Sequence, residues 1–312
     1  MRAVFLGNHT VGVTVMRELA RQGVLAGVVA HPLDTEDGVR YLSVFDTAGE
    51  LGVPRLRAKG TVPDLATFVK NCSPDVLVVA DYRYLLPVEV LECVPHGGIN
   101  FHPSLLPAYR GRAPINWAIL HGETTLGLTV HCMDAGMDTG DILAQKRYYL
   151  RNTEDVGDAL RKLYPLYAEL THYVVTALQE GNLPRHPQNH ALASTFPRRR
   201  PEDGVLDFGL PAVETLNLVR AVAQPYPGAF AWCDSCKVIF WKACLDDAHQ
   251  KGCCPPGTIV HASTDSFSVQ CGQGRLRVLQ WQADKPLWRP EAGQLFSTGF
   301  SRSKEHEPAV TE

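Results

Sequence analysis

The stretch INFHPSLLPAYRGRAPINWAILHGE, residues 99–123, decides how this chain is interpreted. Its first residues read as a short apolar strand, and Asn100 and His102 lie two positions apart within it. Because side chains two residues apart on a strand point to the same face, the two polar groups should project together. The pattern therefore predicts two hydrogen-bonding groups that share one place at the end of a strand.

The chemistry of the two side chains is complementary. A histidine titrates near neutral pH and can take or return a proton. An asparagine amide can donate a hydrogen bond to an oxygen that becomes negative as a carbonyl carbon is attacked. Asn100 and His102 thus suit acyl transfer to an external nucleophile. The alternative is structural, since such residues beside a proline-rich loop also cap turns.

A carboxylate that orients the imidazole would complete a catalytic set. The segment MDAGMDTGD supplies three candidates, Asp134, Asp138 and Asp141, and the residues alone do not choose among them. His131 lies just upstream and has no chemical context in the sequence, so it is expected at the surface.

The segments before this stretch alternate between strand-like and helix-like patterns. This alternation is typical of βαβ units with a parallel sheet, which binds ligands at the carboxyl ends of its strands. An amphipathic helix is expected over residues 152–181, with Asn152 or Thr153 as its N-cap. Residues 1–190 are therefore predicted to form an α/β, Rossmann-like domain.

The composition changes after this domain. Residues 191–204 are rich in proline and arginine and lack periodicity, which indicates a linker loop. Short strand-like runs with turn signals occupy residues 205–300 and are typical of a small OB-like β-barrel. Residues 301–312 are expected to be a frayed tail.

Charge and hydropathy narrow the class of protein. The chain has 312 residues, enough for two domains, and a formal net charge of −3. A nucleic-acid partner is disfavoured because nucleic-acid binders usually carry a basic excess. No apolar run reaches the roughly 18 residues of a membrane helix, and the N-terminus has no signal-peptide pattern. A cytoplasmic enzyme without a membrane partner is the expectation.

The nine cysteines fit a reducing compartment better than a disulfide framework. Cys233, Cys236, Cys253 and Cys254 have a spacing compatible with zinc. However, the last two are adjacent and no histidine sits in register, so no metal is expected.

The turn after the first strand reads FLGNHTVG and is not the G-x-G-x-x-G pattern of nicotinamide-binding proteins. We expect this turn to shape a substrate pocket instead. The candidate contacts are Asn8, His9 and Thr10.

Two linked segments, residues 100–123 and TLGLTVHCMDAGMDTGDILAQ at 125–145, strongly resemble the formyltransferase family that uses 10-formyltetrahydrofolate. The family signature is Asn-x-His-x-Ser-Leu-Leu-Pro, followed by a Leu-Asp-Thr-Gly-like turn. Here the signature stands as NFHPSLLP and MDTG. The resemblance extends over almost the whole chain and implies a Rossmann-like catalytic domain followed by an OB-like barrel.

The resemblance implies a role for each signature residue. Asn100 would polarise the formyl oxygen, His102 would be the general base and acid, and Asp138 would hold His102 and raise its pKa. Met137 stands where the family often has leucine, which has a similar volume. The implied folate contacts are Tyr84, Leu85, Leu86, Arg112, Asp134, Gly136 and Met137.

Within the family, the chain most resembles the sugar-nucleotide branch. Residues 81–91, 196–208 and 218–230 are similar to segments of the formyltransferase that acts on UDP-4-amino-4-deoxy-L-arabinose. The implied acceptor is a nucleotide-linked amino sugar, and a homodimer is compatible because the family's sugar enzymes often pair. The tRNA branch has a basic loop where residues 31–43 carry three acids and one arginine, which suits phosphate contacts poorly.

A diphosphate on the acceptor would need cations, and arginine offers paired donors. The alternative for an arginine run is a solvated surface. Tyr226 would stack on a base or only shape its turn. The candidate cations are Arg198, Arg199, Arg200 and Arg220.

Three other functions stay open at this point. The first is formylation of another amine, such as hydroxyornithine or methionyl-tRNA. The second is hydrolysis of 10-formyltetrahydrofolate. The third is a non-catalytic nucleotide- or folate-binding module, which would have no need of a base and an oxyanion donor on one strand.

Overall fold

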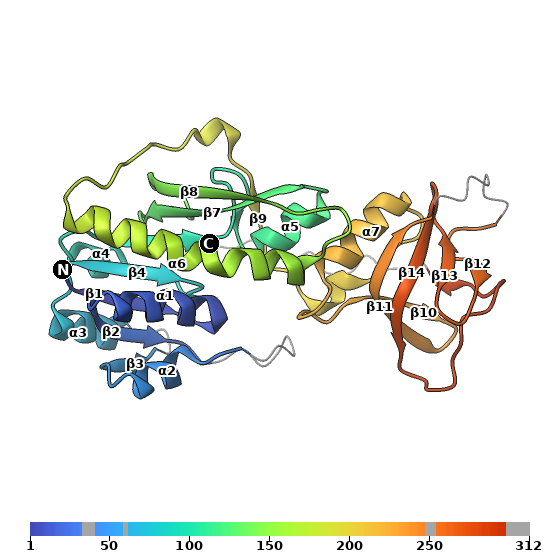
Figure 1. The fold of residues 1–312 in the computed structure, drawn as a ribbon, viewed down its shortest axis with the longest axis horizontal. Coiled ribbons are helices and arrows are strands. Elements are labelled where there is room, and N and C mark those ends of the chain that lie inside the picture. Colours follow the sequence, from blue (N-terminus) through green and yellow to red (C-terminus); the bar gives the residue numbers. More distant parts are fainter. Residues whose placement is uncertain (33–40, 59–61, 247–253, 298–312) are drawn as a thin grey trace, which may run out of the picture. The chain divides into compact units, whose positions relative to one another are not determined.

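The computed structural model of the chain describes residues 1–32, 41–58, 62–246 and 254–297. The chain divides into two compact units, Met1–Arg199 and Arg200–Glu312 (Figure 1). The division falls inside the segment predicted as a linker, and the tail expected over 301–312 lies outside the described residues. Within the described part of the chain, no helix is both long and apolar enough to cross a membrane.

The first unit is built on a seven-stranded sheet with the order β3-β2-β1-β4-β5-β7-β8. Its strands are β1 (Ala3–Gly7), β2 (Leu25–Ala30), β3 (Arg55–Arg57), β4 (Val76–Ala80), β5 (Gly98–His102), β7 (Thr125–Cys132) and β8 (Ile142–Tyr149). The first five in this order run parallel, as predicted, while β7 is antiparallel to β5 and β8 is antiparallel to β7. The α/β class is therefore confirmed, with an antiparallel hairpin added at one edge.

Helices cover both faces of this sheet (Figure 1). On one face, Tyr167 of α6 (Val156–Gln179) stacks on Phe101 of β5 at a ring-centroid distance of 5.8 Å. On the same face, Phe5 of β1 packs against α1 (His9–Arg21). On the other face, Val4 and Leu6 of β1 join a core cluster with residues of α3 and α4. Because Phe5 alternates with Val4 and Leu6, β1 is apolar on both sides, as a central parallel strand must be. The helices of the unit are α1 (His9–Arg21), α2 (Val44–Glu50), α3 (Val62–Cys72), α4 (Val88–Glu92), α5 (Pro114–Leu120) and α6 (Val156–Gln179).

Helix α6 begins later than predicted. Its N-cap is Asp155, which accepts a hydrogen bond from the Asp158 N–H at 3.1 Å, while the Asp158 carboxylate accepts one from the Asp155 N–H at 3.1 Å. A capping box was expected, but its placement at Asn152 or Thr153 was wrong. Arg151 and Glu154 form a separate turn first, in which the Arg151 N–H donates to the Glu154 carboxylate at 2.7 Å.

The second unit contains a six-stranded antiparallel sheet with the order β12-β13-β14-β11-β10-β15. Its elements are helix α7 (Ala212–Ala221) and strands β10 (Ala229–Cys233), β11 (Cys236–Leu245), β12 (Ile259–Ala262), β13 (Phe267–Gln270), β14 (Arg275–Ala283) and β15 (Phe296–Ser297). The two edges of this curled sheet meet. There, Thr258 forms a β-bridge with Leu295, and the Ile259 N–H donates to the Gln294 carbonyl at 2.8 Å. The predicted barrel-like architecture is confirmed, and among the strands of this sheet only the two-residue β15 was not predicted.

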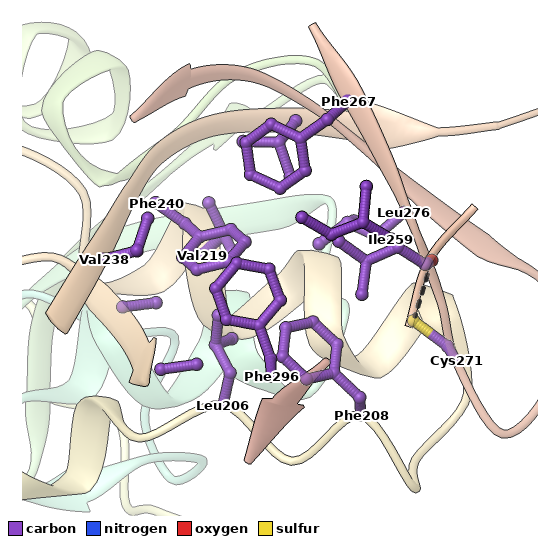
Figure 2. Close-up of a cluster of buried hydrophobic side chains, with 14 of the residues drawn as sticks. Leu206, Phe208, Val219, Val238, Phe240, Ile259, Phe267, Cys271, Leu276 and Phe296 are labelled. Carbon is purple, nitrogen blue, oxygen red and sulfur yellow. Dashed lines mark hydrogen bonds between the residues drawn. The ribbon is translucent and has the colours of Figure 1, made fainter. Parts of the chain in front are cut away.

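The interior of the curled sheet is filled with aromatic rings (Figure 2). Phe296 lies 5.3 Å from Phe240 and 5.6 Å from Phe208 between ring centroids, within the range of favourable ring pairs. Val219 of α7 joins the same cluster, so the helix closes one side of the core.

The cysteines of the second unit do not form a metal site within the described residues. No group of three or more His, Cys, Asp or Glu side chains in that part of the chain could hold a metal ion. Cys233 and Cys236 are opposite each other in the backbone register of the β10–β11 hairpin, and both are buried. Cys253 lies outside the described residues.

Candidate active site

The predicted catalytic residues meet at the carboxyl end of β5. Asn100 and His102 project together from this strand, and Asp138 comes from the connection between β7 and β8. The Asp138 carboxylate lies 3.4 Å from Asn100 Nδ2 and 3.6 Å from His102 Nδ1. Asp134, by contrast, accepts hydrogen bonds within its own turn, from the Gly136 N–H at 3.0 Å and the Thr139 hydroxyl at 2.6 Å.

His102 is buried and its tautomer is determined by a backbone carbonyl. Its Nε2 lies 2.7 Å from the Tyr109 carbonyl oxygen, so Nε2 carries the proton and donates it. The basic atom of the neutral ring is therefore Nδ1, which faces Asp138. Burial lowers the pKa of His102, although the Asp138 charge and the Tyr109 carbonyl act to raise it. The Asp138 charge raises the pKa of His102, as the family resemblance implies. Burial lowers that pKa by more, so the imidazole is neutral at neutral pH.

Asp138 is a fixed negative charge. Burial alone would raise its pKa, but the neighbouring His131 and His102 side chains and the Gly111 N–H at 2.9 Å lower that pKa to about 2. Its backbone is left-handed, with φ of 55°, a conformation that costs a non-glycine residue roughly 1–3 kcal/mol. Strain of this kind persists only where the surroundings hold the residue in place.

His131 was expected at the surface, and that prediction was wrong. It pairs with Asn100 across β5 and β7, and only 3% of its surface is exposed. Its Nδ1–H donates to the Cys132 carbonyl at 2.7 Å, so in the neutral ring Nε2 is an acceptor. Nε2 lies 3.1 Å from Asn100 Nδ2 and 3.4 Å from the Asp138 carboxylate.

These distances are compatible with one N–H of Asn100 being shared between two acceptors. Asn100 Nδ2, His131 Nε2 and Asp138 Oδ1 form a triangle with sides of 3.1, 3.4 and 3.4 Å. Both acceptors therefore lie on one side of Nδ2, at an angle of roughly 60°, about half the angle between the two N–H bonds of a planar amide. If one N–H is shared between the two acceptors, the second can donate to a reacting oxygen.

The folate contacts implied by the family divide into exposed and buried residues. Leu85 and Met137 are large apolar side chains that are exposed, and Arg112 donates to the Arg83 carbonyl at 2.8 Å from an exposed position. Leu86 is buried in the core cluster that underlies α3 and α4. Tyr84 is half-buried, in a ring contact with Tyr82.

The predicted acceptor contacts after β1 lie at the carboxyl ends of β1, β2 and β4. Asn8 is buried, and its amide donates to His31 Nδ1 at 2.8 Å and to the Pro32 carbonyl at 3.3 Å. His9 Nδ1 lies 2.6 Å from the Asp81 carboxylate, and Thr10 is half-buried beside it. Asn8 therefore ties two strand ends together, while His9 and Thr10 offer partly exposed surface.

The predicted cations are placed differently from one another. In the first unit, the Arg199 guanidinium lies 4.8 Å from the Trp117 ring, and Arg198 is exposed. In the second unit, Arg200 is exposed, whereas Arg220 is buried and donates to Asn217 at 3.0 Å. The remaining candidate of the second unit is the half-buried Tyr226.

Comparison with solved structures places the fold among N-formyltransferases. An N-formyltransferase from Helicobacter canadensis, solved with folinic acid and dTDP-3-aminofucose, is 16% identical, with a TM-score of 0.68 over 90% of this chain and 100% of that one. WlaRD, a sugar 3N-formyltransferase solved with dTDP and 5-N-formyl-THF, is 15% identical, with a TM-score of 0.68 over 91% and 98%. Methionyl-tRNA formyltransferase from Clostridium thermocellum is 17% identical, with a TM-score of 0.56 over 80% and 95%.

Family models match both units of the chain. The model described as formyl transferase matches residues 1–166, and the model of the formyl transferase C-terminal domain matches residues 199–290. The first match contains Asn100, His102 and Asp138 together with the sheet that positions them. The chain therefore belongs to the formyl transferase family and is a formyltransferase.

Proposed function

We propose that this enzyme transfers a formyl group from 10-formyltetrahydrofolate to the primary amine of a nucleotide-linked amino sugar. The observation that carries the proposal is the buried cluster at the end of β5, in which Asp138 lies 3.4 Å from Asn100 and 3.6 Å from His102. A module that only binds folate or a nucleotide needs neither a neutral buried base nor a fixed anion beside it.

His102 moves the proton in this mechanism. The uncharged amine attacks the formyl carbon, and the proton that the nitrogen must lose passes to Nδ1 of His102. The imidazolium that forms is stabilised by the Asp138 carboxylate, 3.6 Å from Nδ1, and by the Tyr109 carbonyl at Nε2. When the bond from the formyl carbon to the folate nitrogen breaks, His102 returns the proton to that nitrogen, and the histidine is neutral again.

Asn100 stabilises the charge that develops on the formyl oxygen. In this mechanism His131 and Asp138 share one of its N–H bonds, and the second donates to this oxygen. Because the amide is held before the reaction begins, it does not have to reorient when the charge appears.

The exposed residues near the catalytic cluster in sequence fit a folate donor. Exposed Leu85 and Met137 supply apolar surface for a flat ring system, and Arg112 supplies a cation. Met137 also immediately precedes Asp138, so a ligand that contacts this turn lies beside the catalytic carboxylate. When bound, 10-formyltetrahydrofolate supplies the activated formyl group, and the protein supplies the proton transfer and the oxyanion donor.

An amino-sugar nucleotide is the acceptor class that the observations support best. The similar N-formyltransferase from Helicobacter canadensis was solved with dTDP-3-aminofucose, and WlaRD, a sugar 3N-formyltransferase, was solved with dTDP. A net charge of −3 argues against tRNA, whose affinity depends on lysine and arginine contacts to phosphates. Arg198 and Arg199 are the cations of the first unit that could meet a diphosphate.

The direct test is mass spectrometry of a panel of amino-sugar nucleotides incubated with the enzyme and 10-formyltetrahydrofolate. Addition of one formyl group to a single panel member would support the proposal and identify the substrate. Consumption of the donor with no formylated sugar would instead indicate hydrolysis or another amine acceptor. No consumption with any acceptor would contradict the proposed donor.

The double variant Arg198→Ala/Arg199→Ala tests the diphosphate. The proposal expects KM for the nucleotide sugar to rise about tenfold, since a charge-assisted contact is worth about 1.5 kcal/mol or more, while the KM for folate stays unchanged. Arg161→Ala is the matched control, because Arg161 is an exposed arginine of α6 paired only with Asp158. An unchanged acceptor KM in the double variant would favour an amine without a diphosphate.

A further inference from the structure

Gln188 is a buried amide whose NH₂ group holds the loop that carries Asp138. It is 6% exposed, and its Nε2 donates to the Asp138 carbonyl at 2.9 Å and to the Gly140 carbonyl at 2.7 Å. Its Oε1 accepts from the Arg110 guanidinium at 2.6 Å. Because a guanidinium can only donate, the oxygen must face Arg110 and the NH₂ group must face the two carbonyls.

Arg110 connects this amide to the other side of Asp138. It is 7% exposed and lies in the short strand β6 (Arg110–Gly111), and its guanidinium also contacts His190 Nδ1 at 3.0 Å. The next residue, Gly111, donates its N–H to the Asp138 carboxylate at 2.9 Å. Asp138 is thus held at its backbone carbonyl through Gln188 and at its carboxylate through Gly111.

A strap of residues 186–196 carries Gln188 across this region. At one end, His186 and Ile142 exchange backbone hydrogen bonds of 2.8 and 2.9 Å just after the Asp138 loop. At the other end, β9 (Thr195–Phe196) pairs in parallel with β6. The Ser194 hydroxyl accepts from the Tyr109 N–H at 2.9 Å, beside the carbonyl that orients His102.

The close approach of the strap depends on glycine. A Cβ at Gly111 would lie 2.5 Å from the Phe196 carbonyl oxygen, and the residue has φ of 91°. The strap therefore contacts both segments that orient the catalytic histidine and aspartate.

We propose that Gln188 and Arg110 are positioning residues that set the separation between the Asp138 carboxylate and His102. Neither acts on the substrate, and both act through the strained backbone of Asp138. The kinetic consequence rests on the proposed function, whereas the structural consequence at His102 does not.

The kinetic test uses Gln188→Met, which keeps the length of the side chain and removes its three hydrogen bonds. We expect kcat to fall about tenfold or more with both KM values within about twofold, since misplacement of a catalytic group by 1 Å can cost about 10²-fold. Asn189→Ala is the matched control, because Asn189 is exposed on the same strap and its side chain accepts only from the Ala191 N–H at 3.2 Å. This variant should keep the wild-type kcat.

A double variant separates positioning from general stability. In an Asp138→Asn background, Gln188→Met should cause no further loss of kcat, because its effect passes through the carboxylate. An additive loss would overturn the proposal. If Gln188→Met does not fold, Gln188→Glu asks the same question, since it keeps the oxygen that faces Arg110 and replaces both donors.

Nitrogen-15 NMR titration of the histidine rings gives a readout that needs no turnover. The Asp138 charge raises the pKa of His102, so Gln188→Met should lower that pKa, in the same direction as Asp138→Asn. An unchanged His102 titration would overturn the proposal. If the wild-type protein transfers no formyl group but Gln188→Met still lowers the His102 pKa, the proposed function is wrong and the positioning role stands.

Discussion

The carboxyl edge of the first unit's sheet carries two histidine–aspartate pairs that differ in separation and exposure. His9 and Asp81 lie 2.6 Å apart at the ends of β1 and β4, and the Asp81 side chain is 46% exposed. His102 and Asp138 lie 3.6 Å apart, and the Asp138 side chain is only 12% exposed. Both pairs use strained backbone, with φ of 60° at His9 and 55° at each aspartate.

The comparison shows that the closer pair is the poorer candidate for catalysis. In the first pair, Asp81 holds Nδ1 of His9, and water screens the charge of this partly exposed carboxylate. In the second pair, Nε2 is engaged by the Tyr109 carbonyl and Nδ1 is left to take a proton. Burial there keeps His102 neutral, while Asp138 stays charged with a pKa of about 2. The two pairs therefore differ in burial, and the second places its imidazole beside a carboxylate that is shielded from water.

The largest effect should come from His102→Asn. This substitution removes the only group that accepts the amine proton, so kcat should fall about 10³-fold, within the range found for general bases. Binding of the folate donor, measured by calorimetry, should change little because His102 is buried beneath the site. Wild-type turnover in this variant would contradict the assigned base.

Asp138→Asn should rank second, with kcat reduced about 10²-fold. The shape is preserved, but the charge that stabilises the protonated His102 is lost. Asp81→Asn is the matched control, because it removes the same charge from the other pair and should leave kcat within about threefold. Equal losses of kcat in the two variants would mean that both pairs contribute to turnover, which would contradict the assignment of Asp138 alone.

The next largest effect should come from His131, which lies beside the buried pair of His102 and Asp138. In His131→Phe, the Asn100 amide loses the acceptor 3.1 Å away that fixes one of its N–H bonds. We expect kcat to fall about tenfold, since a net hydrogen bond is worth roughly 1 kcal/mol, with folate binding unchanged. His131→Gln, which retains an acceptor, should recover part of this loss, and an equal loss in both variants would argue against orientation by His131.

The sequence predicts this site unevenly, for physical reasons. Asn100 and His102 are predictable because the two-residue period of a strand is local. Asp138 was separable from Asp134 and Asp141 only through the family resemblance, because a turn has no such period. His131 and Gln188 were missed because their roles depend on pairing between β5 and β7 and on a strap without periodicity. The same limit applies to β6, β9 and β15, each two residues long.

The pH dependence should also distinguish the pairs. Because burial lowers the pKa of His102, the acid limb of kcat/KM should lie below the ordinary histidine value of about 6.5. Stability follows the same sign: the folded state resists protonation of His102, so stability declines as pH falls below about 6.5 towards the folded pKa. Asp138 adds stability above its unfolded value of 3.8, which is lost as pH falls towards 2. An acid limb above 6.5 would contradict the role of burial.

The smallest effect on chemistry should come from His9→Asn, and it sharpens the comparison most. If His9 belongs to the acceptor pocket, this variant should raise KM for the amino-sugar nucleotide about threefold, a cost near 0.65 kcal/mol, and leave kcat within twofold. The folate KM should not change, because the implied folate contacts are Arg112 and residues of the segments 84–86 and 134–137. A large fall in kcat would mean that the short, exposed pair takes part in proton transfer. In that case Nε2 of His9 would be the atom that accepts the proton, because Asp81 holds Nδ1.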